Sequence, residues 1–391
     1  MTSPRASPFL AAVVKRGRLG EPFIWDSVRS LARYTPLLVA DEFDDRVDWT
    51  AERVLLGGHP ARARIAQRAL RTMHGEERHP FELSPKAPAR RRLRDAAARA
   101  DVVHAHYGPT GVWCRNELGA DRPALVTTFY CYDLFAEGKY PWWQSAYRKL
   151  AETSELVLVL SEYIREFVLE LGWPEDRVEV DRLGIDLEMF PYRAPRVDTG
   201  SGPVILSVSN FQPKKGLVYL VRAFAQIAAR HDGARLRLLG GGEEEARVHA
   251  EVERQNLEGC VEFLPPVPYA DLPAVYGDAD LFCLPSVMST DFDLDEISMV
   301  IVQAMACGLP VVTTHHAGIA EIVRDGVNGM LAEERSAESL ADALDRLLAA
   351  PDRWPSVAEA ARRTVEESFD ARRHGEALER RFDTARTRHG R

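Results

Sequence analysis

The segment from Pro285 to Thr314 constrains the fold of this chain more than any other part of the sequence. Ser298–Ala306 is rich in small and apolar residues, which is typical of a buried helix. Gly308 stands where helices commonly end, Pro310 cannot continue a helix, and Val311–Thr313 has the composition of a short buried strand. The segment therefore predicts an internal helix that is followed directly by a buried strand.

Acidic residues lead into this predicted helix, at Asp291, Asp293, Asp295 and Glu296. The first turn of a helix has unpaired N–H groups and a partial positive charge, so it can bind a phosphate group. The simpler interpretation is that the side chain of Asp295 or Ser298 caps the helix. The local sequence leaves both interpretations open.

Strands and helices alternate along the rest of the chain in two series. The expected strands are Phe9–Lys15, Asp101–Ala105, Ala124–Phe129 and Leu156–Leu160 in the first series, and Val204–Val208, Arg235–Leu239, Cys260–Leu264 and Leu281–Leu284 in the second. Residues 194–202 lie between the two series and are rich in proline, glycine and polar side chains, as linkers are. This alternation predicts an α/β protein with two domains, at 1–195 and 203–369, whose parallel sheets bind ligands at the carboxyl ends of their strands.

Composition argues against several classes of function. The net charge of −9 disfavours general nucleic-acid binding. The five cysteines form neither a Cys-x-x-Cys pair nor a Cys/His cluster, which argues against a disulfide framework and a zinc site. The sequence has no apolar run of the roughly 18 residues that a membrane helix needs, and Phe9–Val14 is too short for a signal peptide. We therefore expect a cytoplasmic protein without a nucleic-acid partner.

Residues 61–99 form a strongly basic segment, in which eleven lysines and arginines accompany four acidic residues. Charge runs of this kind usually belong to helices whose side chains face water, and this is the interpretation we favour. The alternative is a surface for an anionic acceptor, or for peripheral contact with the inner face of an acidic membrane.

Two loops place glycine next to basic residues. The chain has only six lysines, yet Lys214 and Lys215 are adjacent in the loop that follows strand Val204–Val208. Gly17 and Arg18 follow the first expected strand, where a glycine loop can approach a phosphate group, although many such loops are only tight turns.

Several of these motifs together resemble the family-4 retaining glycosyltransferases. The residues that carry the resemblance are Ser209-Asn210 and Lys215-Gly216, Gly184-Ile185-Asp186 with Phe190, Pro285-Ser286, the helix motif from Asp295 to Val312, and Glu321, Gly326 and Gly329. The likeness covers nearly the whole chain, and Gly20–Ile24 and Val180–Phe190 are similar to the branch that builds bacterial exopolysaccharides. It implies the GT-B fold, in which two Rossmann-like domains face a cleft and residues 370–391 pack back on the first domain.

The chain departs from the family pattern at several positions. The family arginine that contacts the donor diphosphate is Asn210, and the first motif glutamate is Asp295, followed by Glu296 instead of glycine. The second motif glutamate is Gln303, and the His-Gly pair of the first domain begins with Tyr130. The motif lysine, Lys215, is retained.

The resemblance implies transfer of a sugar from a UDP-linked donor to a hydroxyl group in a polysaccharide, glycolipid or natural product, with retention of configuration. No metal and no cofactor is expected, because Lys215 and the helix N-terminus can carry the diphosphate charge. The expected catalytic residues are Asp295, Lys215 and Tyr130. The expected donor-binding residues are Gly17, Arg18, Asn210, Lys215, Glu296, Ile297, Ser298 and Gln303, and the acceptor-side candidates are His106 and Asp133.

Three alternatives stay open at the level of sequence. Asp291, Asp293 and Asp295 spell Asp-x-Asp twice, which is typical of the metal–diphosphate site in the other glycosyltransferase fold, although the surrounding motifs favour the two-domain fold. A sugar-nucleotide epimerase or hydrolase could use the same fold. A catalytically degenerate binding or partner protein is the third, and the departures from the family pattern count in its favour.

Overall fold

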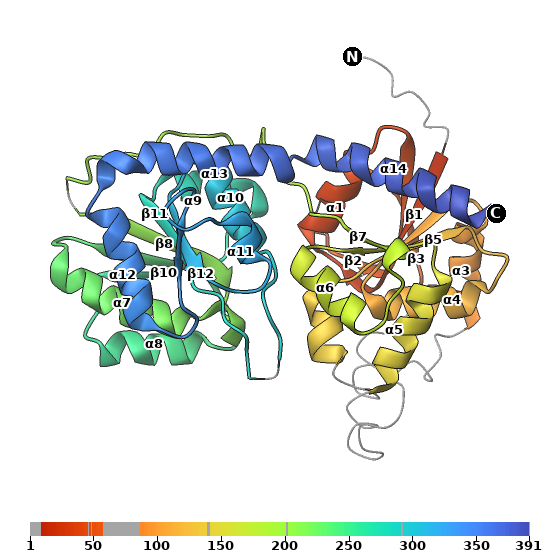
Figure 1. Cartoon of the computed structure of the whole chain (residues 1–391), viewed down its shortest axis with the longest axis horizontal. Coiled ribbons are helices and arrows are strands. Elements are labelled where there is room, and N and C mark those ends of the chain that lie inside the picture. The colour runs from red at the N-terminus through yellow and green to blue at the C-terminus, as the bar shows by residue number, and fades with distance from the viewer. Residues whose placement is uncertain are drawn as a thin grey trace. The chain divides into compact units, whose positions relative to one another are not determined.

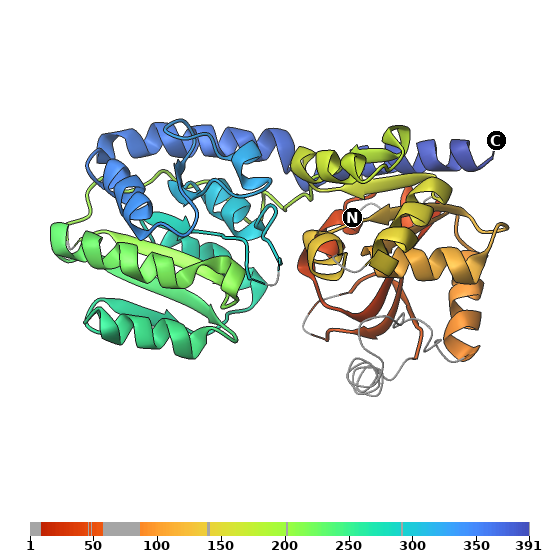
Figure 2. The same ribbon diagram turned by 60° about the horizontal axis from the view of Figure 1, so that its bottom comes forward.

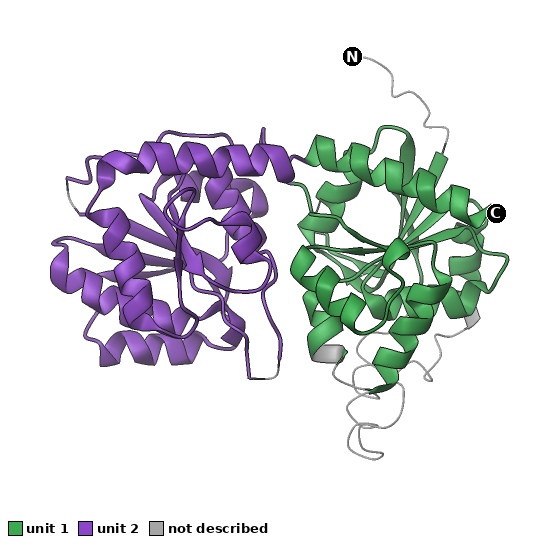
Figure 3. Cartoon of the chain, viewed as in Figure 1, with its two compact units in different colours: residues 1–184, 371–391 green, residues 185–370 purple. Residues whose placement is uncertain are grey.

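The computed structural model describes residues 9–45, 47, 49–57, 87–138, 141–200, 202–290 and 292–390. The chain forms two compact units, residues 1–184 with 371–391, and residues 185–370 (Figure 3). The division differs from the expected one, because residues 185–195 belong to the second unit and not to the first. Ile185 and Phe190 are buried in the core of the second unit, and the Ile185 amide donates to the Phe369 carbonyl at 2.7 Å.

The first unit contains a seven-stranded sheet in the order β3-β2-β1-β4-β5-β6-β7, and all of its strand pairs are parallel. Its strands are β1 (Phe9–Leu19), β2 (Tyr34–Phe43), β3 (Glu52–Leu55), β4 (Val102–His106), β5 (Ala124–Thr128), β6 (Leu156–Val159) and β7 (Val178–Val180). Its helices are α1 (Pro22–Arg29), α3 (Ala87–Ala97), α4 (Gly108–Leu118), η3 (Tyr132–Glu137), α5 (Pro141–Thr153), α6 (Glu162–Glu170), η4 (Glu175–Arg177) and α14 (Ala371–His389). Helix α14 contacts β4, β5 and α1, and helices lie on both faces of the sheet (Figures 1 and 2).

Strand β1 is longer than the sequence predicts, and this corrects the expected glycine loop at residues 16–20. Arg18 and Leu19 still pair with β2 after a bulge, and Leu19 is fully buried. Gly17 takes a φ of 87° at the bulge, a left-handed conformation that favours glycine. Gly17 and Arg18 therefore belong to a bulged strand end, because pairing with β2 and burial of Leu19 keep the chain in the sheet.

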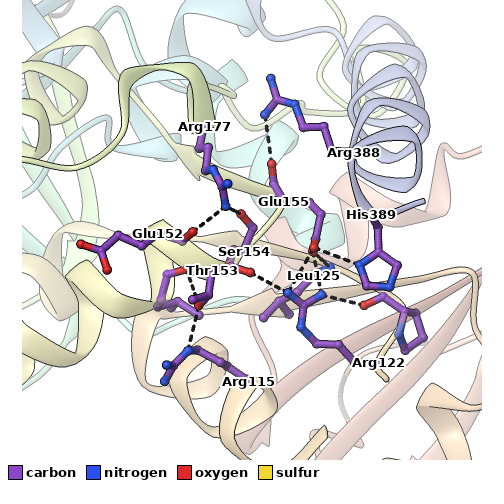
Figure 4. A network of polar contacts seen from close by, with 12 residues as sticks. Arg115, Arg122, Leu125, Glu152, Thr153, Ser154, Glu155, Arg177, Arg388 and His389 are labelled. Carbon is purple, nitrogen blue, oxygen red and sulfur yellow. Dashed lines mark hydrogen bonds and ion pairs between the residues drawn. The ribbon is translucent and has the colours of Figure 1, made fainter. Parts of the chain in front are cut away.

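Glu155 joins the last turn of α14 to the start of β6 (Figure 4). Its carboxylate accepts hydrogen bonds from Arg122 at 2.6 and 3.2 Å and from the Leu125 amide at 2.6 Å, and it lies 3.0 Å from His389 Nδ1. Arg388 donates to the Glu155 carbonyl at 3.0 Å. Burial raises the pKa of Glu155, but these hydrogen bonds outweigh burial and lower it below the ordinary value. The ionised Glu155 carboxylate therefore links helix α14 to the sheet.

The basic segment 61–99 lies mostly outside the described residues. Only its last part is described, as helix α3 and the turn that follows, where Arg92 donates to the Leu56 carbonyl at 3.2 Å and Arg99 pairs with Glu52 at 2.7 Å. The described arginines Arg91 and Arg94 are largely exposed to solvent. This part agrees with solvent-facing helices, and a binding surface at 61–86 stays a prediction.

The second unit contains a six-stranded parallel sheet in the order β10-β9-β8-β11-β12-β13. Its strands are β8 (Val204–Asn210), β9 (Arg235–Gly241), β10 (Val261–Leu264), β11 (Leu281–Leu284), β12 (Val311–Thr314) and β13 (Met330–Ala332). Its helices are η5 (Pro213–Lys215), α7 (Leu217–Arg230), α8 (Glu245–Arg254), η6 (Tyr269–Asp271), α9 (Leu272–Gly277), α10 (Met299–Cys307), α11 (Ile319–Ile322), α12 (Ala337–Leu348), η7 (Pro351–Arg353) and α13 (Trp354–Ser368). Each unit thus has the Rossmann-like arrangement of helices around a parallel sheet, and the expected fold class is confirmed.

Candidate active site

The strand order of the second sheet reverses between β8 and β11, whose neighbours lead away in opposite directions. Open parallel sheets bind ligands at such a reversal, outside the carboxyl ends of the strands. Strand β8 ends at Asn210 and leads to Lys215, while β11 leads to residues 285–298, and the Val287 amide donates to the Lys214 carbonyl at 2.8 Å. The topology therefore brings Lys214 and Lys215 close to Asp293 and Asp295.

Gly216 allows the Lys215 turn to lie against the end of β11. It takes a φ of 64°, and a Cβ at this position would lie 2.1 Å from the Pro285 carbonyl oxygen. Lys215 is only 8% exposed, and its Nζ donates to Asp295 Oδ2 at 2.7 Å and to Ser298 Oγ at 3.3 Å. The lysine side chain therefore points into the site and not into solvent.

Asp295 is the acceptor at the centre of this cluster. In addition to Lys215, the Ser286 hydroxyl donates to Asp295 Oδ2 at 2.9 Å. Burial raises the pKa of Asp295, but the charges of Lys215 and Lys214 and the two hydrogen bonds outweigh burial and lower the pKa to about 2. Asp295 is therefore ionised at neutral pH and can accept hydrogen bonds from a ligand's hydroxyl groups.

The second lysine neutralises another acid of the same run. Lys214 Nζ lies 2.9 Å from Asp293, so Asp293 and Asp295 are each paired with a lysine. Asp291 lies outside the described residues. Within the described part of the chain, no group of three His, Cys, Asp or Glu side chains could hold a metal ion. These lysine pairs do not favour the Asp-x-Asp metal interpretation.

Helix α10 begins after Ser298, as the sequence predicts, but without a side-chain cap among the described residues. The Ser298 hydroxyl meets Lys215, and the Asp295 carboxylate is occupied by Lys215 and Ser286. Gly308 ends the helix with a φ of 90°, which confirms the expected C-terminal glycine. The simple capping interpretation therefore does not hold for either side chain. The Ile301 amide donates to the Ser298 carbonyl at 2.9 Å, so the amides of Met299 and Val300 are the ones in the first turn that suit an anion.

The other donor-binding candidates of this unit differ in their surroundings. Asn210 is exposed at the end of β8, whereas Glu296 and Ile297 are buried. Gln303 is also buried, and its Oε1 accepts a hydrogen bond from the Tyr276 hydroxyl at 3.0 Å. The Gln303 oxygen thus already has a partner, which leaves its NH₂ group as the part best suited to a ligand.

In the first unit, the acceptor-side candidates surround the carboxyl ends of β4 and β5. His106 Nδ1 lies 2.8 Å from the Tyr130 hydroxyl, and both side chains are buried. Asp133 accepts from the amides of Tyr130 at 2.8 Å and Gly108 at 2.6 Å, so it fastens the two strand ends together. Burial raises the pKa of Tyr130 well above its ordinary value, so the phenol keeps its proton and can only act as a hydrogen-bond donor or acceptor.

Gly17 and Arg18 also lie in the first unit, where they contact aspartates in β2 and directly after it. The Gly17 amide donates to Asp41 at 2.7 Å, Arg16 donates to the same carboxylate at 2.9 Å, and Arg18 pairs with Asp44 at 2.9 Å. Each arginine therefore already has an acidic partner, and a role of Gly17 and Arg18 in donor binding stays a prediction.

Sequence reasoning missed several residues that the structure brings to Asp295. Ser286 donates to its carboxylate, and His316 accepts from its backbone amide at 3.2 Å and contacts Glu334. Ser286 belongs to a recognised motif and could have been identified from it. His316 and Glu334 follow β12 and β13, and only the order of strands in the sheet places His316 beside Asp295 and Glu334 beside Met288.

Two family models match the chain. The model described as "Glycosyl transferases group 1" matches residues 192–364, and the model described as "Glycosyltransferase Family 4" matches residues 46–189. Among curated relatives, WcaL of Escherichia coli K12, whose name refers to colanic acid biosynthesis, is 34% identical over 278 residues, which are 70% of this chain and 68% of WcaL. The amylovoran biosynthesis glycosyltransferase AmsK of Erwinia amylovora is 31% identical over 288 residues, or 72% of this chain and 70% of AmsK.

Solved structures support the fold over almost the whole chain. A sucrose-phosphate synthase from Thermosynechococcus elongatus superimposes with a TM-score of 0.76 at 19% identity, covering 96% of this chain and 98% of its own. HepE of Anabaena, solved in complex with UDP, gives a TM-score of 0.73 at 19% identity, covering 96% of this chain and 100% of its own. In the described part of the chain, no helix has the length and apolar character needed to cross a membrane.

Proposed function

The chain belongs to the family-4 type of glycosyltransferases, in the exopolysaccharide branch, and from this premise we propose that it transfers a hexosyl group from a UDP-linked sugar to a hydroxyl acceptor with retention of configuration. The observation that carries the proposal is the Lys215–Asp295 pair beside the uncapped N-terminus of α10. This pair lies where a parallel sheet binds its ligand.

A nucleotide-sugar donor consists of a sugar and a nucleoside diphosphate. Lys215 can support the binding of both parts because its ammonium group has three N–H donors. Two of them point to Asp295 and Ser298 among the described residues, so the third can donate to the diphosphate. The bond between the anomeric carbon and the phosphate oxygen breaks, and the diphosphate keeps the electron pair. Lys215 and the α10 amides stabilise the charge that develops there, which is the largest catalytic contribution expected of such a site.

The acceptor oxygen then forms the new bond on the face that the diphosphate leaves, and its proton passes to the leaving phosphate oxygen. Asp295 is ionised and accepts from the hydroxyl groups of the donor sugar, which orients the ring. Tyr130, with its raised pKa, contributes a hydrogen bond and not a base. This mechanism needs neither a metal nor a cofactor, in line with the lysine charges at the site.

The names of the relatives support the choice of substrates. HepE has been solved with UDP and with UDP-glucose, and WcaL and AmsK are named for colanic acid and amylovoran biosynthesis. We therefore propose a UDP-sugar donor and a growing exopolysaccharide or its lipid-linked precursor as the acceptor. A cytoplasmic location, with peripheral membrane contact through residues 61–99, belongs to the same proposal.

A donor screen with the purified full-length chain tests this function. UDP-glucose, UDP-galactose and GDP-mannose would be offered with polysaccharide and lipid-linked acceptors, and nucleoside diphosphate release and product anomeric configuration would be measured with EDTA and with magnesium. We expect UDP release that depends on acceptor and persists in EDTA. UDP binding without turnover would favour the degenerate binding protein, and conversion of the donor without acceptor would favour an epimerase or hydrolase.

A further inference from the structure

We propose that His316 and Glu334 position the donor loop, defined as residues 285–290 and 292–298, so that Asp295 meets the donor sugar in the geometry that transfer requires. The inference rests on the proposed function and adds two positioning residues to it. Neither residue belongs to the motifs that identify the donor site in the sequence. Both follow strands of the second sheet, His316 after β12 and Glu334 after β13.

His316 is buried, with 2% of its surface exposed, and both of its ring nitrogens have partners. The Asp295 amide donates to Nε2 at 3.2 Å, and Nδ1 lies 2.5 Å from Glu334 Oε1. An amide N–H can only donate, so Nε2 must accept, and the ring proton of the neutral imidazole lies on Nδ1 and points to Glu334. The contact with Glu334 therefore selects the tautomer that can hold the Asp295 backbone.

Glu334 also holds the other end of the donor loop. Its second carboxylate oxygen accepts from the Met288 amide at 3.0 Å, and the neighbouring Arg335 donates to the Met288 carbonyl. One carboxylate thus fixes Met288 directly and Asp295 through His316. Between these two points, Phe292 is 59% exposed with a φ of 67°, so the middle of the loop gains little support from packing at this residue.

Asp295 has more need of such support than a glutamate would have. The aspartate side chain has one methylene group fewer, so the position of its carboxylate follows the position of its backbone closely. Lys215 and Ser286 hold the carboxylate, whereas His316 holds the amide of the same residue. A displacement of about 1 Å at a reacting centre can cost about 10²-fold in rate, so a shift of the Asp295 backbone should be visible in turnover.

Two substitutions at His316 separate its two contacts. His316→Gln places an amide oxygen near the position of Nε2 and can still accept from the Asp295 amide. His316→Asn places an amide NH₂ near the position of Nδ1, so it keeps the contact with Glu334 and loses the contact with Asp295. His315→Gln is the matched control, because His315 is the exposed neighbour on the same turn.

The experiment measures kcat, the donor KM, UDP affinity by calorimetry, and the melting temperature for each variant of the full chain. We expect His316→Asn to lower kcat about 10²-fold with UDP affinity changed less than about threefold, because Lys215 and α10 still hold the diphosphate. His316→Gln should keep kcat within about tenfold of the wild type, and His315→Gln within about twofold. Glu334→Gln combined with His316→Asn should lose little beyond His316→Asn alone. The glutamine oxygen can still accept from the Met288 amide, and the Asp295 contact that Glu334 supports through His316 is already lost in His316→Asn.

The outcomes separate this inference from the proposed function. A wild-type chain that transfers sugar, together with His316→Asn and His316→Gln variants of equal kcat, would overturn the positioning role alone. Loss of melting temperature and UDP affinity in parallel with kcat would show a purely structural role and would overturn it as well. A wild-type chain that transfers from none of the donors would overturn the proposed function, and the positioning role with it.

Discussion

Replacing Lys215 with alanine is the most direct perturbation of the donor site. The change removes the ammonium group that donates to Asp295 at 2.7 Å and to Ser298 at 3.3 Å. It also removes the motif charge that should face the diphosphate, at a site where Asn210 stands in place of the family arginine. Because the chain lacks that arginine, the loss of Lys215 should cost more than it would in a relative that has both.

The expected loss of activity is about 10²–10³-fold in kcat, the usual effect of removing one donor aimed at developing charge. Stability should also fall. The pKa of Asp295 is lowered from 3.8 to about 2, so its charged form contributes about 2 kcal/mol of stability, which is fully present above pH 3.8 and lost as the pH falls through about 2. Without Lys215 the pKa of Asp295 should rise and most of this contribution should disappear. The loss stays below the roughly 3–5 kcal/mol of a fully buried pair, because Ser286 and Lys214 remain close.

The assay is single-turnover and steady-state transfer, together with urea unfolding of the same preparations. Lys214→Ala is the matched control, since it removes an adjacent lysine that pairs with Asp293, and it should lower kcat far less. Lys215→Ala combined with Asp295→Asn should recover stability, because no unpaired charge remains, without recovering activity. Lys215→Arg should rescue only in part, because a planar guanidinium does not replace a compact ammonium.

The result that would refute this reasoning is a Lys215→Ala enzyme whose kcat and UDP affinity stay within about threefold of the wild type, which is the range of ordinary surface substitutions. Equal losses for Lys214→Ala and Lys215→Ala would also refute it, since they would show a general effect of positive charge.

Three further perturbations test other parts of the structure. Asn210→Arg restores the family arginine at an exposed position, and calorimetry should show UDP affinity raised about tenfold at low salt and less at high salt; unchanged affinity would remove Asn210 from the donor site. Glu155→Ala removes the carboxylate that pairs with Arg122, a residue that is only 8% exposed. Urea unfolding should show that the free energy of unfolding falls by about 3–5 kcal/mol, whereas the exposed control Glu152→Ala should lower it by less than about 0.5 kcal/mol. Gly240 has a φ of 139°, and a Cβ at this position would lie 1.8 Å from the Ser209 carbonyl oxygen. Gly240→Ala should therefore lower the free energy of unfolding by about 1–3 kcal/mol, which a lower melting temperature would show. An unchanged melting temperature would contradict the close approach of β8 and β9.

Much of the donor site could be predicted from the sequence, because its residues lie in motifs with local signals. The apolar stretch after Ser298 and the glycine at Gly308 identified the helix and its end, and the structure places both as expected. Lys215 was identified by its place in a glycine loop, and the structure buries it against Asp295. The contacts that tune these residues could not be predicted, because Lys215 and Asp295 are 80 positions apart and His316 and Asp295 are 21 apart.

The sequence by itself determined the alternation of strands and helices, the two parallel-sheet units and the motifs at the strand ends, because each of these depends on periodicity or on spacing within a few residues. Only the tertiary structure decided which charges meet. Pairing with β2 keeps Gly17 and Arg18 in a strand, and packing of Ile185 places the boundary between the units before this residue. The Glu155 carboxylate contacts His389, which is 234 positions away in the sequence. These outcomes depend on the order of strands in each sheet and on which distant side chains become hydrogen-bond partners. A short stretch of sequence determines neither of these.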